Sequence, residues 1–387
     1  MRQTDATYPP AAALPASYAQ AYASSLRSSS VAAAPRRFAG LTRVEVGWPR
    51  QNGVASTPEG VGVVPRFVLV PADANHLAVD WGQRFDVRRA DGSCILTDTK
   101  SPLFDVSVGS GAFFVYGNEI QWDGHDGPSP KAGTGFSMGG SILALRYEGD
   151  RRVIATQTQP DDPHAGGGGP WSVEVYQDRF TAPDRAAVET VAINDYRGTG
   201  LAAITADFRT VLVTEDRSLH VLAFQQGDPK TRRAPELVQR ELPYRTRLLS
   251  IVPPNMFLVG DDAGGTLHCL NFDGTERWSL RLPFASGEEP PVDAGDGRVV
   301  VTGAGLASIE NGHVLWSAPG KNPVFATAFQ EGTLAVATGP ELRIVDRDGS
   351  VRQSLRTSEG DMITTPPAIA HDGTVWVATQ KALYVAR

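Results

Sequence analysis

The sequence has few cysteines, no excess of basic residues and no long apolar run. Its 387 residues include two cysteines, Cys94 and Cys269, which excludes a disulfide framework, and no spacing typical of a structural zinc site is present. The formal net charge is -7, which argues against a nucleic-acid-binding protein because such proteins carry a basic face. No segment has the uninterrupted apolar length of a transmembrane helix.

Turn-forming residues are abundant instead. The chain contains 40 glycines and 28 prolines, and hydrophobic residues make up 41% of it. From about residue 41, short runs of Val, Ile, Leu, Phe and Thr alternate with clusters of Gly, Asp, Asn and Pro, a pattern that predicts strands separated by turns. We therefore expect an all-β domain over residues 41–387, preceded by an Ala/Ser/Pro-rich tail over residues 1–40.

The tail allows two interpretations. No charged residue lies between Asp5 and Arg27, and a low content of large apolar side chains predicts disorder. Four larger side chains recur every four residues, however, which would place them on one face of a short docking helix that contacts a partner. These candidate partner-binding residues are Leu14, Tyr18, Tyr22 and Leu26.

The location of the protein follows from how the first residues are interpreted. The tail lacks the apolar block of a signal peptide, so we expect a cytoplasmic protein if Met1 is the natural start. We expect an extracytoplasmic protein if Met1 has replaced a removed export signal.

A repeat is clearest in the C-terminal half. Asp-Gly, Asn-Gly and Asp-Gly pairs at positions 273, 311 and 348 each separate two strand-like runs, and such pairs favour tight β-hairpins. A glycine also opens an earlier strand of each unit, at Gly297, Gly332 and Gly373. A unit of four strands in roughly 40 residues matches one blade of a β-propeller.

Reading the repeat backwards predicts eight units. They cover residues 65–100, 103–140, 141–196, 201–244, 247–284, 289–319, 322–357 and 364–387. The last unit lacks an outer strand, and residues 42–48 form a strand without a unit, so we expect this N-terminal strand to complete the C-terminal blade and close the ring. The result is an eight-bladed β-propeller of four-stranded antiparallel sheets; a different division of residues 141–244 leaves seven blades as the alternative.

The repeats resemble those of the quinoprotein-like, or PQQ-like, propeller family. The segment LHCLNFDGTERW at residues 267–278 is the best match, and WPRQNG at residues 48–53 is similar to the Trp-Pro opening of that family. The resemblance implies that Trp278 and Trp316 pack between neighbouring blades, and we expect the same structural role for Trp48. The family contains quinone-dependent dehydrogenases and non-enzymatic scaffolds.

The chain has few of the residues that quinone-dependent enzymes of this family use. The enzymes of the family commonly use adjacent cysteines and a calcium ion held by Glu, Asn and Asp, whereas Cys94 and Cys269 fall in different predicted blades. The loop at residues 194–200 places Arg197 where a calcium loop needs an oxygen ligand. The acidic, His-containing loops at residues 122–127 and 161–164 are typical of solvated connections. We therefore predict no cofactor, no metal and no catalytic residues.

The sequence favours a non-catalytic propeller scaffold for protein–protein interaction, with a subunit role in a larger assembly as one form of it. Partners would bind through the propeller loops, of which the longest fall within residues 103–196 and 225–236, and through the tail. The alternative is a quinone-dependent dehydrogenase, or a small-molecule or carbohydrate binder, that uses the central channel. Candidate channel-lining segments include residues 104–106, Asp207, Thr327 and residues 366–367.

Overall fold

The structure is a computed structural model of the 387-residue chain. It describes the backbone of residues 34–44, of the strands named below and of most of the chain after residue 200. The ranges after residue 200 are 201–205, 210–215, 217–223, 236–252, 256–261, 264–287, 291–329, 331–370 and 372–387. Side chains are described in residues 34–44, at Val79 and in most of the ranges after residue 200.

Antiparallel sheets of neighbouring strands make up the first half of the described chain. The first sheet contains β5 (Phe67–Leu69), β6 (His76–Asp80), β7 (Phe85–Arg89) and β8 (Cys94–Asp98). The second contains β9 (Leu103–Val108), β10 (Ala112–Tyr116), β11 (Glu119–Asp123) and β12 (Phe136–Ser137). The third contains β13 (Gly140–Glu148), β14 (Arg151–Thr158) and β15 (Ser172–Arg179). A separate ribbon pairs β3 (Arg50–Gln51) with β4 (Val54–Ala55).

The second half continues the same pattern. One sheet contains β16 (Leu201–Ile204), β17 (Thr210–Glu215), β18 (Ser218–Ala223) and β19 (Glu236–Glu241). The next contains β20 (Thr246–Val252), β21 (Met256–Asp261), β22 (Thr266–Leu270) and β23 (Glu276–Arg281). It is followed by β24 (Val292–Asp293), β25 (Arg298–Thr302), β26 (Gly305–Glu310) and β27 (His313–Pro319). Then come β28 (Val324–Phe329), β29 (Leu334–Thr338), β30 (Glu341–Val345) and β31 (Val351–Arg356), with β1 (Ser30–Val31) parallel to β28.

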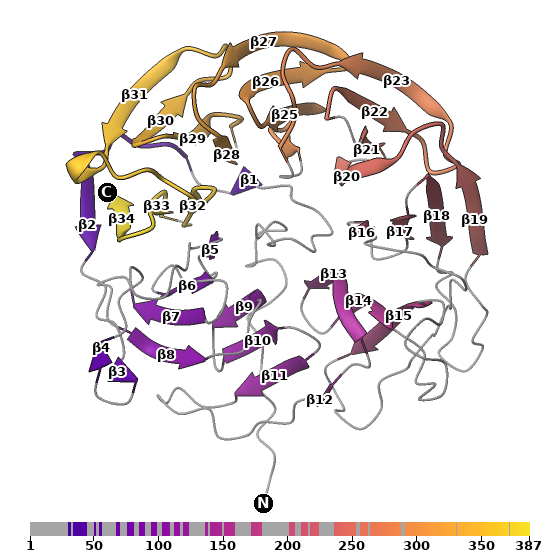
Figure 1. The fold of residues 1–387 in the computed structure, drawn as a ribbon, viewed down its shortest axis with the longest axis horizontal. Helices are drawn as coiled ribbons and strands as arrows, with labels where there is room; N and C mark the ends of the chain where they lie inside the picture. Colours follow the sequence, from indigo (N-terminus) through magenta and orange to yellow (C-terminus); the bar gives the residue numbers. More distant parts are fainter. Residues whose placement is uncertain are drawn as a thin grey trace, which may run out of the picture.

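Each predicted unit contains one of these sheets, and the sheets follow one another around a common centre, with the first strand of most sheets innermost (Figure 1). A 3-10 turn at Ser358–Gly360 leads to the last sheet. The described strands thus confirm the all-β class and the strand-and-turn pattern that the sequence predicts.

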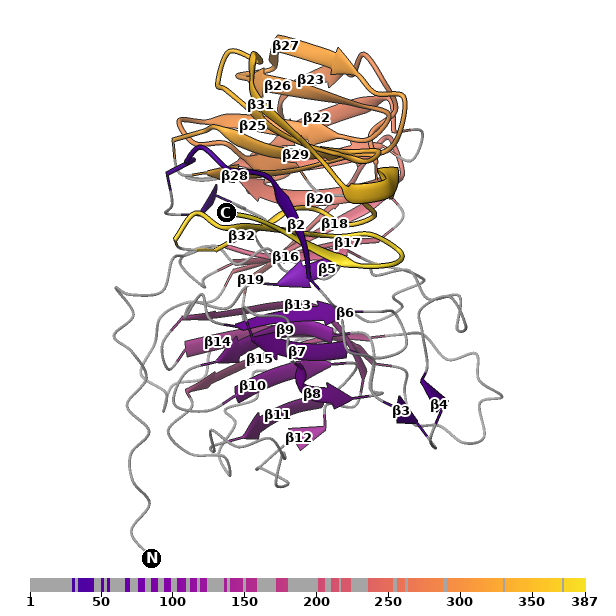
Figure 2. The same cartoon turned by 90° about the vertical axis from the view of Figure 1, so that its left-hand side faces the viewer.

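The last sheet joins the two ends of the chain. It contains β32 (Ala368–Ile369), β33 (Val375–Ala378), β34 (Leu383–Ala386) and, at its outer edge, β2 (Leu41–Val44). β2 is antiparallel to β34, with Leu41 opposite Ala386 and Val44 opposite Leu383. Figure 2 shows β2 close to β32 and the C-terminus. The sequence predicts this pairing for residues 42–48; the described pairing covers residues 41–44, and Trp48 lies outside the described residues.

The core lies between neighbouring sheets, because both faces of a sheet are covered. In β29, Leu334 and Val336 contact the preceding sheet, whereas Ala335 and Ala337 contact the following one. Successive side chains of a strand point to opposite faces, so a strand buried on both sides is apolar throughout. This explains why the middle of β25, the first four residues of β29 and all of β33 are continuous apolar runs that do not alternate with polar residues.

The Asp-Gly and Asn-Gly turns have the predicted backbone. Asn311 and Gly312 have φ angles of 50° and 80°, and Gly349 has a φ angle of 88°. The Asp348 carboxylate accepts hydrogen bonds from the Ser350 amide, at 2.9 Å, and from the Ser350 hydroxyl, at 2.6 Å. These bonds hold the pKa of the Asp348 carboxyl below its usual range. The turn therefore fixes the start of each outer strand.

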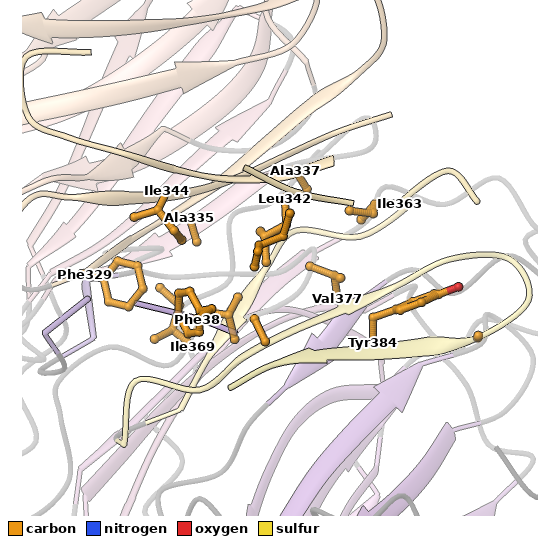
Figure 3. Packing of buried hydrophobic residues seen from close by; sticks show 14 residues of the cluster. Phe38, Phe329, Ala335, Ala337, Leu342, Ile344, Ile363, Ile369, Val377 and Tyr384 are labelled. Carbon is orange, nitrogen blue, oxygen red and sulfur yellow. The ribbon is translucent and has the colours of Figure 1, made fainter. Parts of the chain in front are cut away.

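Residues 34–40 pack against the sheets before β2 begins. The Phe38 side chain is 2% exposed and lies in the cluster between the last two sheets, beside Phe329 and Ile369 (Figure 3). The Ala39 amide donates a hydrogen bond of 2.9 Å to the Arg387 carbonyl. Composition alone does not separate these residues from the Ala/Ser/Pro-rich stretch in which the sequence places them.

Candidate functional site

The tryptophans of the outer strands lie over the next sheet. Trp278 on β23 packs against the turn at Gly312, where a Cβ atom would come within 2.9 Å of its ring. Trp316 on β27 packs in the same way against Gly349, where a Cβ atom would come within 2.8 Å. Each ring also contacts the apolar cluster between its own sheet and the following one. Glycine is thus required at these turns both for its positive φ and for the ring above it.

Residues at the position of these tryptophans on the outer strands also make hydrogen bonds to the turn of the following sheet. The Trp316 indole donates to the Arg347 carbonyl at 2.8 Å, and the Arg240 guanidinium on β19 donates to the Asp273 carbonyl at 2.9 Å. Gln353 on β31 lies next to a sheet without such a turn before its outer strand, because that strand is β2, from the N-terminal part of the chain. Its amide donates instead to the Phe38 carbonyl at 2.6 Å and its oxygen accepts from the Phe38 amide at 3.1 Å. The N-terminal segment therefore takes the place of the missing turn.

A cavity of about 430 Å³ opens beside Trp316, between β27 and the face of the β30–β31 pair. Its lining consists of an apolar set and a polar set. The apolar and small residues are Leu306, Trp316, Ala318, Pro319, Gly320, Val324, Val336, Pro340, Val345, Gly349 and Val351. The polar residues are Lys321, Asn322, Thr338, Glu341, Arg343 and Arg356. We call this cavity the β27–β31 groove; its volume and mixed lining fall within the range of binding sites.

Apolar side chains are exposed along the outer strands that frame the groove. Leu315 is 49% exposed and Val314 is 38% exposed on β27, and Val351 on β31 is 52% exposed. Met362 is 45% exposed and lies close to Gly339, beside the loop that ends the groove. Exposed apolar side chains that gather beside a cavity and are rimmed by charges are typical of an interaction surface.

The groove residues have no recognisable motif in the sequence. Glu341 and Arg343, which are partly exposed, alternate along β30 with the buried Leu342 and Ile344, and this alternation is the available signal for a second face. The pattern does not show that Trp316 and Lys321, from the preceding unit, lie across from that face.

The predicted partner-binding residues Leu14, Tyr18, Tyr22 and Leu26 lie outside the described residues. The same is true of Trp48, of Asp207 and of the loops within residues 103–196 and 225–235 that we expected to bind partners. Of the candidate channel residues, Thr327 is 2% exposed and its hydroxyl donates to the Pro367 carbonyl at 2.6 Å. The Ser250 hydroxyl on β20 makes a similar bond to the Pro291 carbonyl at 3.4 Å. These hydroxyls therefore link the inner strands of neighbouring sheets through their hydrogen bonds.

The other described side chains that could take part in chemistry do not form one site. Cys269 is fully buried, and burial raises the pKa of its thiol to about 11. Tyr244 stacks on His268 with ring centroids 3.8 Å apart, and His268 Nδ1 lies 2.8 Å from a Glu276 carboxylate oxygen. Burial is the main cause that raises the pKa of the Tyr244 hydroxyl, which makes no hydrogen bond to the part of the chain that the structure describes. Within the described ranges, no group of three or more His, Cys, Asp or Glu residues is placed to hold a metal ion.

His220 on β18 makes the stability of the fold depend on pH. Its side chain is 4% exposed, neither ring nitrogen has a hydrogen-bond partner among the described residues, and burial lowers its pKa below the ordinary value of 6.5. The unfolded chain therefore binds a proton at a higher pH than the folded chain, so the free energy of unfolding decreases as pH falls through about 6.5. We expect urea denaturation to show lower stability at about pH 5.5 than at about pH 7.5.

The matched variant is His220→Leu, which keeps an apolar side chain of similar size and removes the titrating group. Its stability is expected to change less than that of the native chain between the two pH values. An unchanged pH dependence in the variant would assign the effect to other groups.

Comparison with known proteins identifies the fold. No protein-family model and no curated protein sequence matches this chain. Among solved structures, BamB from Moraxella catarrhalis superposes with a TM-score of 0.52 at 13% identity, over 91% of this chain and 99% of that one. Hsv2 from Kluyveromyces lactis superposes with a TM-score of 0.50 at 10% identity, over 76% of this chain and 98% of that one. The similarity to these propeller structures and the succession of four-stranded sheets define a β-propeller.

Along the ranges that the structure describes, none of the helical turns has the length and apolar character needed to cross a bilayer.

Proposed function

We propose that this chain is an eight-bladed propeller, closed by its N-terminal strand, that acts as a non-catalytic scaffold for protein–protein interaction. Support for the blade count comes from the sheets, because each of the eight predicted units contains one. Support for closure comes from the last sheet, in which β2 supplies the outer strand next to β34. A closed ring would cover the outer faces of the first and last blades, which an open array of sheets would expose to water.

The β27–β31 groove is the observation that carries the scaffold proposal. It combines a cavity with exposed apolar side chains at Leu315 and Val351, on rigid strands of neighbouring sheets. A partner that covers these side chains would remove apolar surface from water, which is the main favourable contribution in protein association. The titratable groups described above do not converge on this groove as a pair suited to acid–base chemistry: its one carboxylate, Glu341, is already bound by Arg343.

Capture experiments with a groove variant test this proposal. In Leu315→Asp with Val351→Asp, two charges replace apolar contact surface, so proteins that the immobilised full-length native chain captures from native lysate should be lost. Because both side chains are about half exposed, the melting temperature should stay nearly unchanged. The bound proteins are quantified by mass spectrometry.

The control is Gln239→Asp with Ser279→Asp, which adds the same charge at exposed positions of β19 and β23. This variant should retain the captured proteins. Equal capture by both variants, the absence of any specifically captured protein, or quinone-dependent dye reduction by the native chain would contradict the scaffold proposal.

A further inference from the structure

The β27–β31 groove has two chemically different ends. At one end, Trp316 packs over Gly349, and Val345 lies directly opposite Val351 in the strand register. At the other end, Glu341 lies opposite Arg356, and the Thr357 amide that follows donates to the Pro340 carbonyl at 2.9 Å. The loop after β27 reaches this same end, because the Asn322 amide lies against Gly339. The groove is therefore apolar at the Trp316 end and polar at the Pro340 end.

The polar end carries an excess of positive charge. The Arg343 guanidinium is bound to the Glu341 carboxylate, with its Nε atom 2.8 Å from Oε2. Lys321 and Arg356 line the same end, and in the described part of the chain neither has an ion pair or a side-chain hydrogen bond. Three cations and one carboxylate thus face the cavity of a protein whose net charge is -7. This local reversal of sign favours a negatively charged ligand.

The apolar surface is longer than the cavity. Outside the cavity, Val314 and Leu315, which precede Trp316 on β27, are also exposed apolar side chains. A small dicarboxylate would reach the cationic end and leave this apolar surface uncovered. An extended peptide places carboxylates at one end and apolar side chains at the other, so it matches both ends of the groove.

We propose that the β27–β31 groove binds an extended acidic segment of a partner protein, with carboxylates at Lys321 and Arg356 and an apolar side chain against Trp316. This inference rests on the proposed scaffold function and adds the chemistry of the bound segment. The attraction between exposed charges is screened by salt, so binding weakens as ionic strength rises.

Selection from a library of random heptapeptides displayed on phage, with the full-length protein as the target, tests the inference. Enriched peptides should carry Asp or Glu within a few positions of an aromatic or aliphatic residue. A synthetic peptide from that set, labelled with a fluorophore, should bind at least about tenfold more weakly to Lys321→Glu with Arg356→Glu, the equivalent of about 1.4 kcal/mol. The peptide with its acidic residues changed to lysine should instead favour this charge-reversed variant.

Arg277→Glu with Arg281→Glu is the matched control, because it makes the same change of charge at exposed positions of β23, outside the groove. Binding of the acidic peptide should be retained by this variant. The inference is overturned if no peptide is enriched, if the enriched peptides are neutral or basic, or if the groove variant binds as well as the native chain. It is also overturned if glutarate, a small dicarboxylate, binds as tightly as the peptide.

Failure of the inference is distinguishable from failure of the scaffold function. If Lys321→Glu with Arg356→Glu retains the captured proteins that Leu315→Asp with Val351→Asp loses, the scaffold function stands and the acidic segment is wrong. If native chain and both variants capture nothing specific, the scaffold function itself fails.

Discussion

Replacing Phe38 by alanine is expected to lower the free energy of unfolding by about 3–5 kcal/mol. The ring is 2% exposed and packs between the last two sheets, so its removal leaves a cavity among Phe329, Ile369 and their neighbours. Its backbone makes both hydrogen bonds with the Gln353 side chain, and these bonds remain in the variant. The loss therefore reports on the side chain alone, and urea denaturation monitored by tryptophan fluorescence measures it.

Truncation separates this segment from the residues before it. Deletion of residues 1–29 retains Phe38 and β2, and we expect nearly unchanged stability. Deletion of residues 1–44 removes both and exposes the free edge of β34 to other chains, so aggregation in light scattering should follow. If the longer deletion stays monomeric and unfolds like the full chain, the proposed closure of the ring by β2 is wrong.

Gly332→Ala is expected to destabilise the fold by about 3 kcal/mol or more, through backbone strain and overpacking together. Its φ angle is 76°, and a Cβ atom would lie 2.3 Å from an Arg298 guanidinium nitrogen and 2.7 Å from the Ala294 carbonyl oxygen. Arg298 cannot easily move away, because it is fully buried and donates to the Gly332 carbonyl at 2.6 Å and to the Arg347 carbonyl at 2.8 Å.

Gly297→Ala is the control for the strain alone. Gly297 occupies the same position in the preceding unit with a φ angle of 73°, but a Cβ atom there would meet no atom within 4 Å. It should cost about 1–2 kcal/mol, the penalty for a left-handed residue with a Cβ atom. Equal losses in the two variants would show that the buried guanidinium adjusts to the extra methyl group.

Local signals were enough to predict the strands and turns. Asp-Gly and Asn-Gly pairs favour tight turns in which the glycine has a positive φ angle, so Asn311 and Gly312 could be placed in a hairpin from their neighbours alone. The pairing of residues 42–44 with the last strand followed from a strand missing at one end of the repeat and a spare one at the other. Both inferences depend on patterns that are complete within a few residues or within one repeat.

The role of Phe38 and the groove could not be predicted in this way. Phe38 is a single aromatic residue beside an Ala/Ser/Pro-rich stretch, and its partner Gln353 is 315 positions away. Arg343 and Arg356 lie on paired strands of one sheet, and only the packing of the preceding sheet on this one brings Lys321 to the same cavity. Such a site depends on the angle and distance between sheets, which the order of apolar and polar residues does not encode.

The hydrogen bond between the Ala39 amide and the Arg387 carbonyl has a mechanical consequence. β2 and β34 are antiparallel, so the chain before β2 and the chain after β34 leave the pair at the same end, with Leu41 opposite Ala386. Tension between two attachments at these points would peel the strands apart one hydrogen bond at a time, the weakest geometry for a strand pair, instead of shearing all of them together. Phe38 precedes the first of these paired residues in the chain, so its ring must leave the core before the strands separate. Its burial therefore protects the β2–β34 pair against peeling.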